Sequence, residues 1–249
     1  MPPLPLAGRM SPSQGASNPV QVNLACGITT GRGETLQERV MHVSEIFYSL
    51  QGEGPLVGEP SVFIRLGGRI EPYCPWCDTA YAIHEYREMA PEEIMKEAGR
   101  YACRNAVITG GEPFLQWESG LKTLHRTLTA KGWRISYETS GKAGIPDLHD
   151  ATVVLSPKNI AGQWQVAPEA LGRAHSFKFV AQDLSSLREI DIFVQENALQ
   201  KDKVSIMPMG MTRDEQLQRM EMVFTFCRKH GYRMTPRLHI LIFDTKRRV

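Results

Sequence analysis

The chain has 249 residues, of which 42% are apolar and 22% charged, and its 29 basic residues nearly balance 27 acidic ones. A chain of this length can bury one sizeable core, and this composition is typical of a soluble globular protein. The net charge of +2 gives no electrostatic reason to expect a nucleic-acid or membrane partner, and no apolar run approaches the roughly 20 residues of a membrane helix. We expect neither partner, and a cytoplasmic location.

Residues 1–40 differ from the rest of the chain. They are rich in Pro, Gly, Ser and Thr, show no sustained apolar period, and cannot form a core of their own. No continuous apolar stretch follows Arg9, so the segment does not resemble a secretory signal. We predict a disordered N-terminal extension over 1–40 and one folded domain over 41–249.

From residue 41 onward, strand-like and helix-like segments alternate. Apolar runs at 43–48 and 61–66 predict strands. A helix follows, because Pro91 suits a first helical turn and acidic residues come directly after it. A short buried strand is predicted at 106–109, before a helix that ends near Gly132. The apolar residues of that helix recur at helical spacing: Leu121, Leu124 and Leu128.

The second half of the chain continues the alternation. Short apolar runs predict strands at 135–137, 152–155, 176–180 and 204–207. The last helix begins at a capping box over 212–215, and Gly231 ends it. Its apolar stripe is Leu217, Met220 and Phe224. A final strand is predicted at 238–243.

This alternation predicts an α/β fold with a mainly parallel sheet and outer helices. About six strands are too few for a closed eight-stranded barrel, so we expect an open, partial (β/α) barrel. Side chains that carry chemistry should then lie at the carboxyl ends of the strands.

Four polar segments follow predicted strands at those ends. The first, 65–79, contains Cys74-Pro-Trp-Cys77, and the others are Thr109-Gly-Gly-Glu-Pro113, Glu138-Thr-Ser-Gly141 and Ser156-Pro-Lys158. Together they resemble the radical S-adenosylmethionine (SAM) superfamily, in which a three-cysteine loop follows the first barrel strand and a Gly-Gly-Glu-Pro segment follows the second. The resemblance implies the partial barrel of that superfamily.

A finer resemblance is to the 7-carboxy-7-deazaguanine synthase family, and it covers essentially all of 41–249. The matching segments are Glu45-Ile-Phe-Tyr-Ser-Leu-Gln-Gly-Glu-Gly54, Trp76-Cys-Asp-Thr79, Ser156-Pro-Lys158, Lys178-Phe-Val180 and Leu238-His239. Each segment alone is weak evidence, whereas their order and spacing together are specific.

The resemblance implies a carbon–nitrogen lyase that converts 6-carboxytetrahydropterin to 7-carboxy-7-deazaguanine with loss of ammonia, in the synthesis of queuosine or archaeosine precursors. It implies three cofactors, a [4Fe–4S] cluster, SAM and Mg²⁺. A cluster held by three thiolates leaves one iron open, and SAM binds there. The implied partners are the pterin, an electron donor such as flavodoxin or ferredoxin, and a second copy in a homodimer.

The resemblance also implies roles for individual residues. Substrate-binding residues would be Leu50, Gln51, Gly52, Arg65 and Thr109. Cofactor-binding residues would be Gly111, Glu138, Thr139, Ser156, Pro157 and Lys158. Metal-binding residues would be Cys74, Cys77 and Thr79, the last for Mg²⁺. Arg65 suits a carboxylate because a guanidinium forms bidentate pairs, and no side chain is implied as catalytic because the radical forms on the cofactor.

Two positions depart from the family pattern. A third cluster cysteine is expected near position 69, where this chain has Arg69. The remaining candidates are Cys26, in the predicted extension, and Cys103, at the expected amino end of a strand. Arg248 stands where the family commonly has glycine. A cluster-deficient homologue that keeps the fold and binds pterin or a partner is therefore the alternative to an active lyase.

Two other readings of Cys74-Pro-Trp-Cys77 stay open. Five cysteines in a chain this long do not make a disulfide framework, and the pair could be half of a zinc knuckle or a redox dithiol. A zinc site would need a second Cys or His pair at finger spacing, which the sequence does not have. A redox dithiol would be expected at the start of a helix, and Pro75 and the following Asp-Thr disfavour this. Cys227 is expected in the core, and His239 could be either structural or part of the site.

Overall fold

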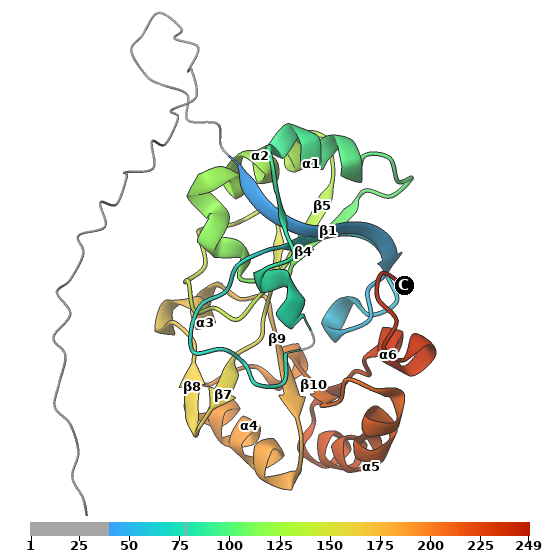
Figure 1. The fold of residues 1–249 in the computed structure, drawn as a ribbon. Coiled ribbons are helices and arrows are strands. Elements are labelled where there is room, and N and C mark those ends of the chain that lie inside the picture. The colour runs from blue at the N-terminus through green and yellow to red at the C-terminus, as the bar shows by residue number, and fades with distance from the viewer. Residues whose placement is uncertain (1–39, 78) are drawn as a thin grey trace, which may run out of the picture. The chain divides into compact units, whose positions relative to one another are not determined.

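The computed structural model describes residues 40–77 and 79–249; residues 1–39 of the predicted extension lie outside this part. Within it, nine strands form one sheet (Figure 1). Their order across the sheet is β11 (Arg233–Met234), β10 (Val204–Pro208), β9 (Ser176–Ala181), β6 (Thr152–Leu155), β5 (Arg134–Thr139), β4 (Asn105–Thr109), β2 (Pro60–Leu66), β1 (Met41–Leu50) and β3 (Arg87–Met89). All neighbours from β2 to β11 are parallel, and β1 is antiparallel to both of its neighbours. The predicted open, mainly parallel sheet is confirmed.

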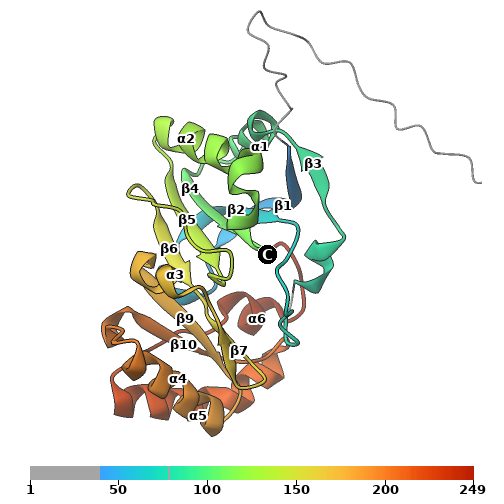
Figure 2. The same ribbon diagram turned by 90° about the vertical axis from the view of Figure 1, so that its left-hand side faces the viewer.

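Among the described residues, five helices precede parallel strands along the chain, and a sixth follows the last strand. They are α1 (Pro91–Ala98), α2 (Lys122–Ala130), α3 (Pro168–Arg173), α4 (Leu184–Glu196), α5 (Arg213–His230) and α6 (Leu238–Phe243). Single helical turns occur at Gly54–Leu56, Ala80–Ile83, Pro113–Gln116, Trp117–Leu121 and Lys201–Lys203, and a small hairpin pairs β7 (Lys158–Ile160) with β8 (Gln163–Gln165). In Figure 2, α4 and α5 flank one end of the curved sheet, and α1 and α2 flank the other.

The core lies between the sheet and these helices. Strand residues such as Ile64, Ile108, Leu155 and Ile206 are fully buried, and the predicted leucines of α2 pack against them. Such continuous apolar runs are expected for parallel strands covered on both faces. Cys227 is buried, as predicted.

Helix α5 begins and ends as its sequence predicts. Thr212 accepts a hydrogen bond from the backbone of Glu215, the Glu215 carboxylate reaches back to the Thr212 N–H, and Gly231 ends the helix at φ +77°. The predicted apolar stripe is wrong, however, because Leu217 and Phe224 are 54% and 56% exposed.

The buried face of α5 instead carries Gln216, Val223 and Cys227. The Gln216 amide donates to the carbonyls of Pro208 (2.9 Å) and Gly210 (3.0 Å). A buried amide needs partners, so these two bonds set the rotation of the helix.

The strand predicted at 238–243 is also wrong, because this segment forms helix α6. Its apolar run is six residues long, and periodicity cannot distinguish a strand from a buried helix at that length. Leu238 N–H donates to the Gly52 carbonyl at 2.8 Å, which carries the chain away from the sheet edge. No helix among residues 40–77 and 79–249 is both long and apolar enough to span a membrane.

Candidate active site

A pocket of about 730 Å³ opens at the carboxyl ends of the parallel strands. It contains every site residue predicted from the sequence except Pro157: Leu50, Gln51, Gly52, Arg65, Cys74, Cys77, Thr79, Thr109, Gly111, Glu138, Thr139, Ser156 and Lys158. Pro157 is buried and does not line it. A separate cavity of about 550 Å³, near α1 and Trp133, contains none of these residues.

A buried ionic network forms the floor of the pocket. Lys178 on β9 donates to Glu53 at 2.8 Å and to Glu138 at 3.1 Å, and Arg237 donates to the other oxygen of Glu53 at 2.7 Å. Burial opposes ionisation of Glu53, but the charges of Lys178 and Arg237 hold its pKa well below the usual range. Burial likewise disfavours charged Lys178, and Glu138 and Glu53 more than offset it, so its pKa is raised. Glu53 and Lys178 are therefore both charged at neutral pH.

Two predicted substrate residues are anchored to this network. Gln51 donates its side-chain amide to Glu138 at 3.0 Å, and Thr109 donates its hydroxyl to the other oxygen of Glu138 at 3.1 Å. Glu138 is the penultimate residue of β5 and Thr109 is the last residue of the neighbouring β4, so parallel pairing brings them together. Glu138, predicted for the cofactor, thus lies among the predicted substrate residues.

Close backbone approach explains two predicted glycines. A Cβ on Gly52 would lie 2.3 Å from His239 Nδ1, so glycine lets His239 reach the pocket wall. Gly111 has φ +51°, and a Cβ there would lie 2.1 Å from the Gly68 carbonyl oxygen. Only glycine suits both conditions.

A second polar group lies beside the cysteine loop. The buried Glu112 carboxylate accepts hydrogen bonds from the hydroxyls of Thr139 and Ser140, both at 2.5 Å, and burial raises its pKa. Lys158 donates to the Ser156 hydroxyl, and burial lowers the pKa of Lys158. These contacts order the predicted cofactor residues without any ligand.

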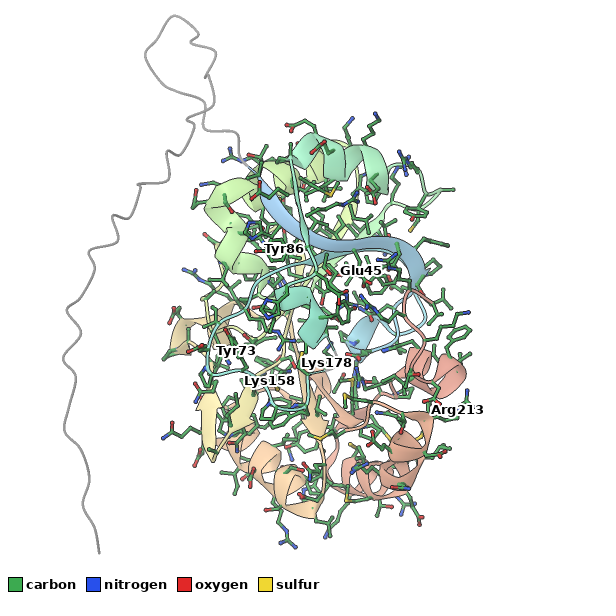
Figure 3. All side chains as sticks on the ribbon, in the orientation of Figure 1. Glu45, Tyr73, Tyr86, Lys158, Lys178 and Arg213 are labelled. Atoms are coloured by element: carbon green, nitrogen blue, oxygen red, sulfur yellow. The ribbon has the colours of Figure 1, made fainter. Side chains whose placement is uncertain are left out.

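One carboxylate at the pocket mouth accepts hydrogen bonds from four side chains. Glu45 is 4% exposed and accepts from Arg65 (3.1 Å), Tyr81 (3.0 Å), Arg247 (2.9 Å) and Arg248 (3.0 Å). Burial opposes ionisation, but the hydrogen bond from Arg248 and the charge of Arg65 lower the pKa of Glu45. Figure 3 shows Glu45 on β1, above Lys178 and Lys158.

The sequence prediction gave no site role to the carboxylates Glu45 and Glu53. Of the cations that bind them, it gave a role only to Arg65 and named Arg248 only as a departure from the family pattern. A signal was present for Glu45, because it falls on the buried side of β1, where Met41 and Val43 are apolar. A charged residue in that pattern is rarely buried without partners. Its arginine partners, about 200 positions away, had no local signal.

The cysteine loop does not fit a three-thiolate cluster. Cys74 and Cys77 share one turn, with Cys77 N–H donating to the Cys74 carbonyl at 3.2 Å, and the guanidinium of Arg69 donates to the Cys77 sulfur. Cys103 is buried and bonded to the Pro60 carbonyl at 3.3 Å, at the amino end of β4. Cys26 lies outside the described residues.

Across residues 40–77 and 79–249, no three His, Cys, Asp or Glu side chains gather as a metal site. The cysteine loop therefore offers two sulfur ligands in the described part of the chain, and the Arg69 guanidinium contacts one of them.

Comparison with known proteins adds to this geometry. The sequence profile of the radical SAM superfamily matches residues 71–156. The 7-carboxy-7-deazaguanine synthase of Hyperthermus butylicus is 34% identical, over 82% of this chain and 93% of its own length. That of Pyrobaculum aerophilum is 33% identical, over 83% and 96%. The crystal structure of QueE from Escherichia coli has the same fold, with a TM-score of 0.65 and 26% identity over 80% of this chain and 95% of QueE.

Proposed function

The chain belongs to the 7-carboxy-7-deazaguanine synthase family of radical SAM enzymes, and we propose that it is the lyase that converts 6-carboxytetrahydropterin to 7-carboxy-7-deazaguanine with loss of ammonia. The family resemblance predicted from the sequence is thereby confirmed. The similarity to named synthases over most of both chains favours the lyase over a binding protein.

The observation that carries this proposal is the composition of the pocket. A pterin presents ring N–H donors and ring acceptors on one side, and the substrate adds a carboxylate. Glu53 and Glu138 are carboxyl acceptors bound by the buried Lys178, and Gln51 and Thr109 donate to Glu138. We assign these groups, with backbone of Leu50 and Gly52, to the pterin ring.

Arg65 is assigned to the carboxylate of the substrate. Its Nε is used by Glu45, which leaves the outer face of the planar guanidinium for a second anion. The buried ion pairs form only the floor of the pocket.

The family implies a [4Fe–4S] cluster and SAM as cofactors. We assign Gly111, Glu138, Thr139, Ser156 and Lys158 to the SAM side of the pocket, with Pro157 shaping the turn between the last two. The disagreement at Arg69 concerns loading of the cluster, and with it the binding of SAM at the open iron. The residues assigned to the pterin ring are not cluster ligands.

We also propose Mg²⁺ as a cofactor, with Thr79 as its protein ligand. The Thr79 hydroxyl lines the pocket beside Cys77, at 3.3 Å from the sulfur. A single hard oxygen suits a cation that takes its other ligands from substrate and water. The proposal also includes an electron donor such as flavodoxin or ferredoxin, a homodimer, and a place in queuosine or archaeosine synthesis.

The test is product formation under anaerobic conditions with SAM, Mg²⁺, a reductant and 6-carboxytetrahydropterin, followed by mass spectrometry. Wild type and Arg69→Cys are assayed together, each at its measured iron content. We expect 7-carboxy-7-deazaguanine from protein with a full cluster. Fully loaded protein that yields 5′-deoxyadenosine but no deazapurine would refute the proposed substrate.

A further inference from the structure

Residues 244–249 cross the pocket mouth between two anchors. At one end, Arg213 on α5 donates to the Leu241 and Ile242 carbonyls, both at 2.7 Å, and its backbone N–H donates to Asp244 at 2.9 Å. At the other end, Glu45 binds Arg247 and Arg248. In Figure 3, Arg213 and Glu45 lie on opposite sides of the region that this segment spans.

The Glu45 carboxylate is saturated by its partners. One oxygen accepts from Arg247 and Arg248, and the other from Arg65 and Tyr81. A carboxylate has about four lone-pair sites, so Glu45 has no capacity left for a substrate donor. Its role is therefore to hold the groups around it.

The corner formed by these groups carries excess positive charge. Three guanidiniums share Glu45, and Glu85 reaches only Arg247, at 3.5 Å. A partly enclosed site with unbalanced cations attracts an anion. The substrate of the proposed function supplies one, because its carboxylate distinguishes it from a plain pterin.

The two arginines of the segment are held differently. The Cζ atom of Arg247 lies 3.4 Å from the centre of the Tyr81 ring, and its guanidinium bridges Glu45 and Glu85. These contacts give Arg247 a structural role. Arg248 binds Glu45 through Nε, lines the pocket, and its side chain is 61% exposed. Its φ of +58° is a left-handed conformation that arginine rarely adopts. Such backbone outliers cluster at functional sites, where surrounding contacts hold them.

We propose that Glu45 is a positioning residue that holds Arg248 beside Arg65, and that these two guanidiniums together recognise the carboxylate of the substrate. The inference rests on the proposed function and adds a specificity-determining residue to it. Two guanidiniums can each engage one oxygen of a carboxylate, which binds it more selectively than either alone.

The test compares binding of 6-carboxypterin and of pterin, which lacks the carboxylate, measured by ligand fluorescence. SAM and Mg²⁺ are present in every titration, so that both ligands are compared on the same form of the protein. In Arg248→Met we expect binding of 6-carboxypterin to weaken about tenfold, the size of one charge-assisted hydrogen bond. Binding of pterin should stay within about twofold. Lys246→Met is the matched control, because it removes one positive charge from the same segment, and we expect it to change neither ligand.

Glu45→Gln tests the positioning role. An amide has one acceptor oxygen and presents donors to the guanidiniums, so the variant should lose the same preference for 6-carboxypterin. It should also show faster amide hydrogen exchange over residues 244–249. Thermal melting identifies any variant that fails to fold. Because the side chain of Arg248 is exposed, we expect Arg248→Met to fold even if Glu45→Gln does not.

The outcomes separate this inference from the proposed function. Wild type that binds neither pterin contradicts the proposed function itself. Wild type that prefers 6-carboxypterin, with Arg248→Met keeping the same preference, overturns only the role of Arg248. An equal loss for both ligands in Arg248→Met shows a structural role and also overturns it.

Discussion

Replacing Arg69 with cysteine should turn the two-thiolate loop into a three-thiolate cluster site. In the structure the Arg69 guanidinium contacts the Cys77 sulfur, which places side chain 69 next to a cluster ligand. A thiol there would add the third ligand that a four-iron cluster with one open iron requires. We expect iron content in Arg69→Cys to rise to about four per chain after anaerobic reconstitution, against about two or fewer in wild type.

Arg69→Cys should lower the folding stability of the apoprotein only slightly. Arg69 is half-buried, and its described contact is one charge-assisted hydrogen bond. Losing such a bond costs about 1 kcal/mol, which corresponds to a fall of roughly 2–4 °C in Tm for a domain of this size. A larger fall would mean that Arg69 has a structural role, and iron counts would then be read only for folded protein.

The assay is iron and sulfide counting with the visible spectrum and electron paramagnetic resonance of the reduced protein. Arg69→Ser is the matched control, because it removes the guanidinium without adding a thiol, and it should not gain iron. If Arg69→Cys gains no iron over Arg69→Ser, position 69 is not next to the cluster and the reasoning is wrong. If wild type already holds four irons and loses them in Cys26→Ser, the third ligand comes from outside the described residues.

Three further predictions concern the pocket floor and are checked by denaturation and ligand binding. Lys178→Met should destabilise the protein by about 3–5 kcal/mol, because it leaves buried carboxylates without their shared cation. Gly52→Ala should weaken binding of 6-carboxypterin about tenfold or more, since its Cβ would displace His239; Gly172→Ala, with open space around the new methyl, is its control. The pKa of Glu53 is lowered in the fold, so its stabilising contribution is complete above its unfolded value of about 4.3 and is lost as pH falls through the folded value. Glu53→Gln should therefore unfold with a shallower dependence on acid pH.

Contrary results would be equally clear for these three. A Lys178→Met protein as stable as wild type would mean that the pocket floor admits water and screens the carboxylates. Equal binding by Gly52→Ala and Gly172→Ala would mean that His239 moves freely. An unchanged acid slope in Glu53→Gln would mean that Glu53 keeps its ordinary pKa in the fold.

Much of the architecture follows from local sequence. Each apolar run between 43 and 207 that was predicted as a strand is a strand. A buried parallel strand needs continuous apolar residues, and the antiparallel β1 shows the alternating burial of a strand with one covered face. The limits of α5 follow from Thr212 and Gly231, whose capping groups act within a few residues. The order of the motifs at the strand ends also identified the family, since each motif is contiguous in the chain.

Other features depend on contacts between distant segments. The run 238–243 forms a helix whose first residue, Leu238, donates its N–H to the carbonyl of Gly52, just after β1. Helix α5 turns Gln216 toward the core because the side-chain amide of Gln216 donates to the carbonyls of Pro208 and Gly210. A helix, Leu184–Glu196, also went unpredicted, although Asp183 caps it.

Among the charged and polar groups of the site, some positions follow from the sequence and others depend on the tertiary structure. Sequence alone placed Arg65, Thr109 and Glu138 at the carboxyl ends of strands, and parallel pairing of β2, β4 and β5 then brought them into one pocket. Gln51 lines the same pocket from the end of the antiparallel β1. Only the tertiary structure decided that Glu45 would meet arginines about 200 residues away and that the Arg69 guanidinium would meet the Cys77 sulfur. The physical reason is that an apolar pattern reports what a residue buries, whereas the partner of a buried charge is set by where the folded chain brings an opposite charge within hydrogen-bonding distance.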